Sequence, residues 1–122
     1  MASELTLTVD PNPVASGGEA TLSVSWVGLP ANAMVGIAAL WQCWNGAEWV
    51  TTHTIHRGWA GEPSVQGPDV PVLAIGLTVP NSYSILIPDV PPGIYRVWDE
   101  ALLTDPLGPP DTVTGFVIVW VR

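Results

Sequence analysis

Positive charge is scarce in this sequence, which has no lysine and only 3 basic residues, all arginine, against 11 acidic residues. The formal net charge is −8 at pH 7. Binding to DNA or RNA depends on clustered cations that release counterions from phosphates, so this balance argues against a nucleic-acid partner. It argues equally against adhesion to an anionic membrane. We therefore expect protein partners, with glycans as the alternative.

Cysteine pairs and long apolar runs are also missing. Cys43 is the only cysteine, so no disulfide can form within the chain, and we expect a buried, unreactive thiol in its apolar surroundings. No apolar run approaches the roughly 18 residues of a membrane span. Residues 1–5 lack the basic and apolar regions of a secretion signal, so we expect no export by that route unless this start is a cloning remnant.

Convincing helical periodicity is absent as well. The 13 prolines and 12 glycines separate short apolar runs, which is typical of a β-sandwich or barrel. These runs predict strands over residues 5–9, 20–27, 34–44, 47–55, 72–79, 83–87, 94–98 and 112–121. Residues 56–71 and 105–111 are expected to be loops. The run 34–44 is apolar on both faces, which suits a central strand, although a helix is conceivable there. A length of 122 residues, 48% of them hydrophobic, fits one domain over residues 1–122.

The dipeptide Asn45-Gly46 between two apolar runs predicts a β-hairpin with a two-residue type I′ turn. Such a turn fixes the register, with Trp44 opposite Ala47 and Gln42 opposite Trp49. Two faces then follow from the alternation of side chains. One face carries Trp41, Cys43 and Val50, and the other carries Trp44, Trp49, Thr51 and His53.

Four segments together resemble a bacterial immunoglobulin-like domain of the Big type. Residues 5–14 followed by 18–22 resemble the first two strands of such modules, and residues 41–50 resemble their central hairpin. Residues 92–97, Pro-Gly-Ile-Tyr-Arg-Val, resemble the entry into the penultimate strand, and residues 115–119 resemble the closing strand. The resemblance implies an all-β, immunoglobulin-like antiparallel β-sandwich of about seven to nine strands.

Five residues are expected to determine this fold. Trp41 is the candidate for the tryptophan between the sheets. Tyr95, at the start of its strand, can return its hydroxyl to the backbone near the preceding turn. Asn45 and Gly46 form the hairpin turn, and Gly93 precedes the strand of Tyr95.

The sequence carries no recognisable catalytic motif, no phosphate-binding glycine loop and no zinc spacing, so we expect no enzyme and no cofactor. His53 and His56, the only histidines, would point to opposite faces of a continuing strand, which is poor geometry for a shared metal. A loop-end calcium site is conceivable around four acidic residues, although a solvated acidic loop is the simpler interpretation. These residues are Asp99, Glu100, Asp105 and Asp111.

Tryptophan is abundant, with 7 residues in the chain. A small core can hold one or two of them, so the others are available for contact with a protein or a carbohydrate unless loops or a second sheet cover them. The candidate interaction residues are Trp44, Trp49, Trp59, Trp98 and Trp120.

Two functions remain open from the sequence. The first is a capsid decoration or accessory protein on the outer surface of a tailed-phage virion, present as a homo-oligomer and bound to itself, to shell proteins or to both. The absence of lysine, with abundant Ala, Val, Gly, Pro and Trp, also resembles proteins of high-GC actinobacteria and their phages. The second is an extracellular adhesion or carbohydrate-binding module of a larger secreted protein.

Overall fold

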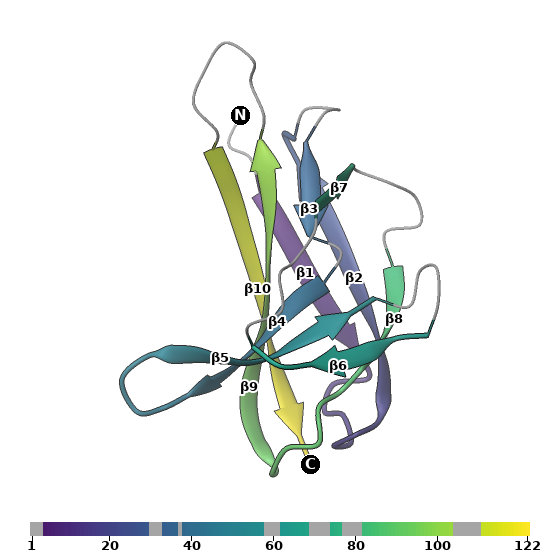
Figure 1. The fold of residues 1–122 in the computed structure, drawn as a ribbon, viewed down its shortest axis with the longest axis vertical. Coiled ribbons are helices and arrows are strands. Elements are labelled where there is room, and N and C mark those ends of the chain that lie inside the picture. The colour runs from purple at the N-terminus through teal and green to yellow at the C-terminus, as the bar shows by residue number, and fades with distance from the viewer. Residues whose placement is uncertain are drawn as a thin grey trace.

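The computed structural model describes residues 4–29, 33–36, 38–57, 62–68, 74–76, 82–103 and 111–122. Within these residues the chain is all β, with no helix, and its strands pair antiparallel in two sheets (Figure 1). The ten strands are β1 (Glu4–Asp10), β2 (Glu19–Val27), β3 (Met34–Gly36), β4 (Ala38–Trp44), β5 (Trp49–His56), β6 (Ser64–Gln66), β7 (Ala74–Gly76), β8 (Ser82–Leu86), β9 (Gly93–Leu103) and β10 (Asp111–Val121). The predicted antiparallel β-sandwich is confirmed.

The two sheets divide the chain unevenly. The first sheet has the order β1-β2-β8. The second has the order β6-β5-β4-β9, with β10 on the other side of β9, and β3 and β7 continue beyond β4 along β9. β4 therefore occupies the central position that its two apolar faces predict. Among the described strands the chain changes sheet three times, after β2, after β7 and after β8.

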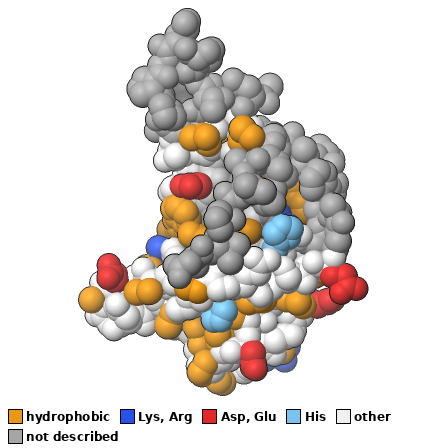
Figure 2. Space-filling model, viewed as in Figure 1, with side chains coloured by type: hydrophobic (Ala, Val, Ile, Leu, Met, Phe, Trp, Pro, Cys, Tyr) orange, Lys and Arg blue, Asp and Glu red, His pale blue; other side chains and the backbone are white. Residues whose placement is uncertain are grey.

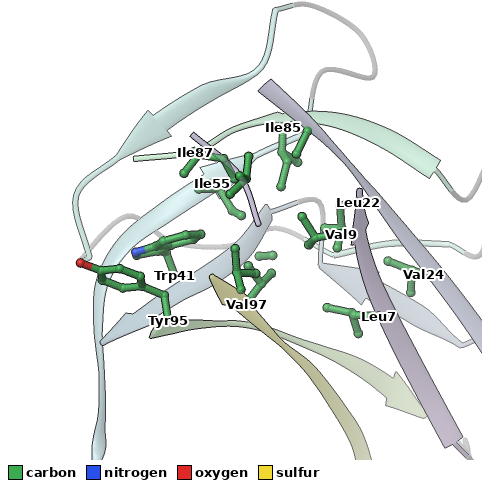
Figure 3. Packing of buried hydrophobic residues seen from close by; sticks show 14 of the residues in the cluster. Leu7, Val9, Leu22, Val24, Trp41, Ile55, Ile85, Ile87, Tyr95 and Val97 are labelled. Atoms are coloured by element: carbon green, nitrogen blue, oxygen red, sulfur yellow. The ribbon is translucent and has the colours of Figure 1, made fainter. Parts of the chain in front are cut away.

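The core lies between the sheets and follows from the alternation of side chains on each strand. On β1, Leu5, Leu7 and Val9 are buried while the residues between them are exposed. They belong to one core cluster with Trp41 of β4 and Val97 of β9, which are both 0% exposed (Figure 3). Each fully buried apolar side chain contributes about 1.5–3 kcal/mol to the free energy of unfolding. The predicted position of Trp41 between the sheets is confirmed.

Tyr95 supports Trp41 from the neighbouring strand. Its ring stacks on that of Trp41, with the centroids 5.0 Å apart and the planes inclined by 29° (Figure 3). Its hydroxyl donates to the carbonyl oxygen of Pro91 at 2.7 Å, which confirms the predicted return to the preceding turn. Desolvation by burial, and secondarily the nearby Cys43 thiol, raises the pKa of Tyr95 above its ordinary value. A Cβ at Gly93 would lie 3.7 Å from this ring, which is an ordinary contact, so the ring does not require glycine at this position.

The outer edge of β10 is partly closed by the segment that follows β1. Asn12 Nδ2 donates to the carbonyl oxygen of Ile118 at 2.9 Å, and the Trp120 amide donates to Asn12 Oδ1 at 2.9 Å. The Val14 amide then donates to the carbonyl oxygen of Trp120 at 2.8 Å, and the Arg122 amide donates to that of Val14 at 3.1 Å. These contacts satisfy backbone groups that an edge strand would otherwise expose.

Gly115 allows β1 to approach β10 closely. A Cβ at this position would overlap the carbonyl oxygen of Leu5, which is backbone and cannot move aside, and would also meet the Leu7 side chain. Glycine is therefore required here for steric reasons.

The predicted turn of the β4–β5 hairpin is wrong. Trp44 pairs with Trp49, so the turn is centred one residue later than expected. Among the described residues no side-chain-bearing residue has a positive φ, and Gly46 alone in this loop has one, at 100°. Asn45 instead uses its side-chain oxygen to accept hydrogen bonds from the amides of Ala47 at 2.9 Å and Glu48 at 2.8 Å.

A β-bulge between Trp41 and Gln42 shifts the register further along the hairpin, so that Gln42 pairs with Thr51 and Trp41 with His53. The predicted pairing of Gln42 with Trp49 is therefore wrong. The shared faces of Trp44 with Trp49 and of Cys43 with Val50 are retained, because each pair is directly opposite.

Two loop predictions also change. The segment 56–71 contains β6, which pairs with the end of β5, so it is not a continuous loop. Of the strand predicted over 72–79, residues 74–76 form β7, and the remainder lies outside the described residues. β9 extends to Leu103, well beyond the predicted end at Trp98. Residues 105–110 lie outside the described residues, and Asp111 begins β10.

Candidate functional site

The candidate site is the solvent-facing side of the larger sheet, on strands β4, β5, β9 and β10, which we call the outer face. Alternation places Ile94, Trp98 and Leu102 of β9 there, between buried residues that face the core. Figure 2 shows hydrophobic side chains gathered on the flank formed by these strands. The apolar members are Leu40, Trp44, Trp49, Ile94, Trp98, Leu102, Phe116, Ile118 and Trp120.

Four of these side chains are about half exposed, which is unusual for residues of their size. The exposed fractions are 50% for Trp44, 48% for Ile94, 55% for Phe116 and 52% for Trp120. Single exposed apolar residues are ordinary on protein surfaces, but a contiguous group on one sheet face marks an interaction site.

Strand pairing makes the group contiguous. Leu40, Trp98 and Phe116 lie side by side in one row across β4, β9 and β10. Ile94 and Trp120 are likewise direct partners near the end of the sheet. Side chains directly opposite one another on a face are about 5 Å apart, so each row presents a continuous apolar surface.

Arg96 is the one cation of the outer face, and it is held by three neighbours. Its Nε donates to Gln42 Oε1 at 2.7 Å. Its guanidinium carbon lies 4.9 Å from the centroid of the Trp49 ring and 5.1 Å from that of Phe116. Burial lowers the pKa of Arg96 below its ordinary value, but an arginine remains charged near neutral pH. Gln42 is itself fixed by donating from Nε2 to Thr51 Oγ1 at 3.2 Å.

The structure brings four of the five candidate tryptophans onto this face. Trp44 and Trp49 meet edge to face, with ring centroids 5.6 Å apart. Trp98 and Trp120 lie on β9 and β10. Trp59 lies outside the described residues. Whether these residues bind a partner stays a prediction.

Of the apolar and charged members of the outer face, only the tryptophans were predicted from the sequence. Ile94, Arg96 and Phe116 carry no motif, and only the alternation along β9 and β10 could have placed them beside Trp98. Counting outward positions on both strands would have found them, because every second residue of a strand shares a face.

A second polar group lies inside the sandwich. Arg57, at the end of β5, donates from Nη2 to Asp99 Oδ2 of β9, and both side chains are 2% exposed. The guanidinium carbon of Arg57 lies 4.4 Å from the centroid of the Tyr83 ring on the opposite sheet. Desolvation by burial raises the pKa of Asp99 to about 6, although Arg57 and the amide of Glu100, which donates to Asp99 Oδ1, both act to lower it.

This ion pair corrects the interpretation of Asp99 as part of a solvated acidic loop or a calcium site. Asp99 is buried and its carboxylate is already bound by a guanidinium, whereas Glu100 points to solvent. Asp105 and the side chain of Asp111 lie outside the described residues. In the part of the chain that is described, no three His, Cys, Asp or Glu residues are grouped so as to hold a metal ion.

The two histidines make separate local hydrogen bonds. His53 Nδ1 lies 2.9 Å from Thr52 Oγ1, and His56 Nδ1 donates to the carbonyl oxygen of Arg57 at 2.8 Å. Both are partly exposed, and they pair with Trp41 and Ala38, which lie on opposite faces of β4. The predicted face of His53 is therefore wrong, because it shares the side of Trp41 and not that of Trp44 and Trp49.

Comparison with models of known protein families gives no match for this chain, and neither does a search among curated proteins. Among the residues described, no helix is long and apolar enough to cross a membrane.

Proposed function

We propose that this protein is a non-catalytic interaction domain that buries the outer face of its larger sheet against protein when it assembles. The observation that supports this proposal is the group of half-exposed large side chains on one sheet face, Trp44, Ile94, Phe116 and Trp120. Aromatic residues flanking an arginine, with few other charges, have the composition of the centre of a protein interface.

The free energy gained by covering these exposed side chains is sufficient for binding only if several of them are covered together. Trp44, Phe116 and Trp120 each leave about half of the side chain uncovered, which is on the order of 100 Å² apiece. Covering each would contribute about 2–3 kcal/mol at about 25 cal/mol per Å². Association costs at least about 4 kcal/mol in lost freedom, so one aromatic residue cannot hold a partner but three can.

The distribution of charge supports display on the surface of a larger assembly. Glu4, Asp10 and Glu19 are exposed on the opposite sheet, so that side of the molecule carries acidic residues while the outer face is largely apolar. With the apolar side buried, the acidic side faces solvent and keeps neighbouring copies apart by repulsion. Together with the resemblance to bacterial immunoglobulin-like domains, this favours a decoration or accessory protein on the outside of a tailed-phage virion.

The proposal is tested by locating the protein on particles. Phage particles from the source culture are purified on a density gradient and labelled with gold-conjugated antibody against this chain, with pre-immune serum as the control. Labelling of the capsid surface is the expected result. Labelled cell walls together with unlabelled particles would support the extracellular alternative. Label found only in the unassembled protein fraction would refute both functions.

A further inference from the structure

The outward side chains of β9 match one another when two copies of the strand are placed face to face and run in opposite directions. They are Ile94, Arg96, Trp98, Glu100 and Leu102, alternating with buried residues. Read from either end, the order is an aliphatic residue, a charge, a central tryptophan, the opposite charge and an aliphatic residue. This strand lies in the middle of the outer face, between β4 and β10.

The two charges cannot satisfy each other within one chain. Arg96 and Glu100 are four positions apart on an extended strand, which separates them by roughly 13 Å. Arg96 contacts Gln42, Trp49 and Phe116, and no carboxylate of the described residues pairs with it. Glu100 is exposed and likewise has no cation within ion-pair distance among those residues. Within the described residues, the outer face thus offers one cation and one anion without an ionic partner, among mostly apolar side chains.

We propose that the outer face is occupied by a second copy of this chain, in a twofold dimer whose axis crosses β9 at Trp98. The axis lies in the interface, perpendicular to β9, so the two β9 strands run antiparallel across the contact. Arg96 of each copy then meets Glu100 of the other, and Trp98 meets Trp98. The inference rests on the proposed role of the outer face as a docking surface and names its occupant.

A second copy fits this face better than an unrelated partner, because the surface is self-complementary. A twofold interface requires that one patch match itself, and the reversed charge order on β9 meets that requirement twice per dimer. Sheets pack face to face in this manner in β-sandwiches, with strands within about 30° of alignment.

The size and net charge of the face also allow a dimer. Four strands and nine residues along β9 give roughly 20 Å by 30 Å, a footprint near the lower limit that each partner of a stable complex buries, about 600 Å². Arg96 and Glu100 cancel each other, the exposed Glu4, Asp10 and Glu19 lie on the other sheet, and Glu48 lies in the turn at the end of β4. Two copies can therefore approach through this face despite a net charge of −8 each.

Charge reversal with rescue tests the proposal. Sedimentation equilibrium over a range of concentrations should show a monomer–dimer equilibrium for the wild type. Arg96→Glu and Glu100→Arg, taken singly, place like charges together twice per dimer and should each weaken the dimer by about tenfold or more. The double variant restores opposite charges and should bring the dissociation constant back to within about threefold of the wild type.

Two controls separate this result from misfolding and from a change in total charge. Glu4→Arg changes the charge by the same amount as Glu100→Arg on the opposite sheet, and should leave the dimer unchanged. Thermal melting of each variant shows whether the fold is intact, and rescue by the double variant cannot arise from a fold that Arg96→Glu has already damaged.

The proposal would be overturned by a wild type that stays monomeric at all concentrations, by a trimer or larger ring, or by single variants that dimerise as well as the wild type. A monomer whose tryptophan fluorescence shifts on adding chitin oligosaccharides would assign the face to a glycan instead. Failure of the dimer proposal is distinguishable from failure of the proposed function. The antibody can label capsids that carry the monomeric protein, and a charge-dependent dimer can form in solution even if no particle is labelled.

Discussion

Replacing Trp41 by alanine tests the division of the tryptophans into core and surface, on which the proposals depend. Trp41 is 0% exposed and stacks on Tyr95, whereas Trp98 of the outer face is partly exposed. We expect Trp41→Ala to destabilise the fold strongly, while Trp98→Ala lowers the stability of the monomer less. The two substitutions remove the same side chain from opposite sides of the same sheet.

The expected magnitude combines two opposing effects at Trp41. Truncating a buried tryptophan to alanine costs about 3–5 kcal/mol through lost apolar contacts and the cavity left behind. The indole Nε1 of Trp41 is buried without a hydrogen-bond partner among the described residues, so its removal returns about 1 kcal/mol of desolvation cost. The net loss is about 3 kcal/mol, which for this chain length corresponds to a fall in Tm of roughly 10–15 °C.

Urea unfolding followed by circular dichroism measures both variants, at a protein concentration low enough to keep the chain monomeric. Trp98 is partly covered by its neighbours on the outer face, so Trp98→Ala should lower the free energy of unfolding by about 1–2 kcal/mol. Trp41→Phe is the matched control, because it keeps an aromatic ring against Tyr95 and should recover more than half of the loss. If Trp98→Ala cost as much as Trp41→Ala, the assignment of inner and outer faces would be refuted.

Three further predictions concern single contacts. Tyr95→Phe removes the hydrogen bond to Pro91 but keeps the stacked ring, so thermal denaturation should show a loss of about 1 kcal/mol; a loss above about 3 kcal/mol would mean that the hydroxyl has a larger role. Gly115→Ala should cost at least about 2 kcal/mol in urea unfolding, because the new methyl group overlaps the backbone of Leu5, and an unchanged stability would contradict that close approach. Burial raises the pKa of Asp99 from 3.8 to about 6, so between these pH values the folded chain binds a proton that the unfolded chain has lost. The stabilisation that this proton gives is complete below about pH 4. About 1–3 kcal/mol of the free energy of unfolding is then lost as the pH rises through about 6. Asp99→Asn should remove that part of the pH dependence, and identical pH profiles for the two proteins would argue against the shift.

The sequence predicted the features that depend on only a few neighbouring residues. Alternation on β1 and β2 gives both the strands and their buried sides, because every second residue shares a face. The position of Tyr95, four residues after Pro91, suffices to predict its hydrogen bond, since both partners belong to one turn and the strand that follows it.

The sequence did not predict features that depend on two competing local conformations or on residues distant in the chain. Asn45 can either adopt a positive φ or cap amides with its side chain, and the sequence does not show which is favoured. Arg57 and Asp99 are separated by 42 positions, so no local pattern links them. The exposed state of Phe116 depends on the register between β9 and β10, which short motifs do not fix.

The hydrogen bonds of Asn12 to β10 bear on how large an assembly of this chain can grow. A strand with an open edge can recruit a further strand without limit and so form fibres, a hazard that increases where many copies are crowded together. Because Asn12 forms hydrogen bonds with the Ile118 carbonyl oxygen and the Trp120 amide, a further strand cannot pair with β10 at these positions. The proposed dimer uses the flat side of the sheet instead, where a pair with twofold symmetry closes on itself and growth stops.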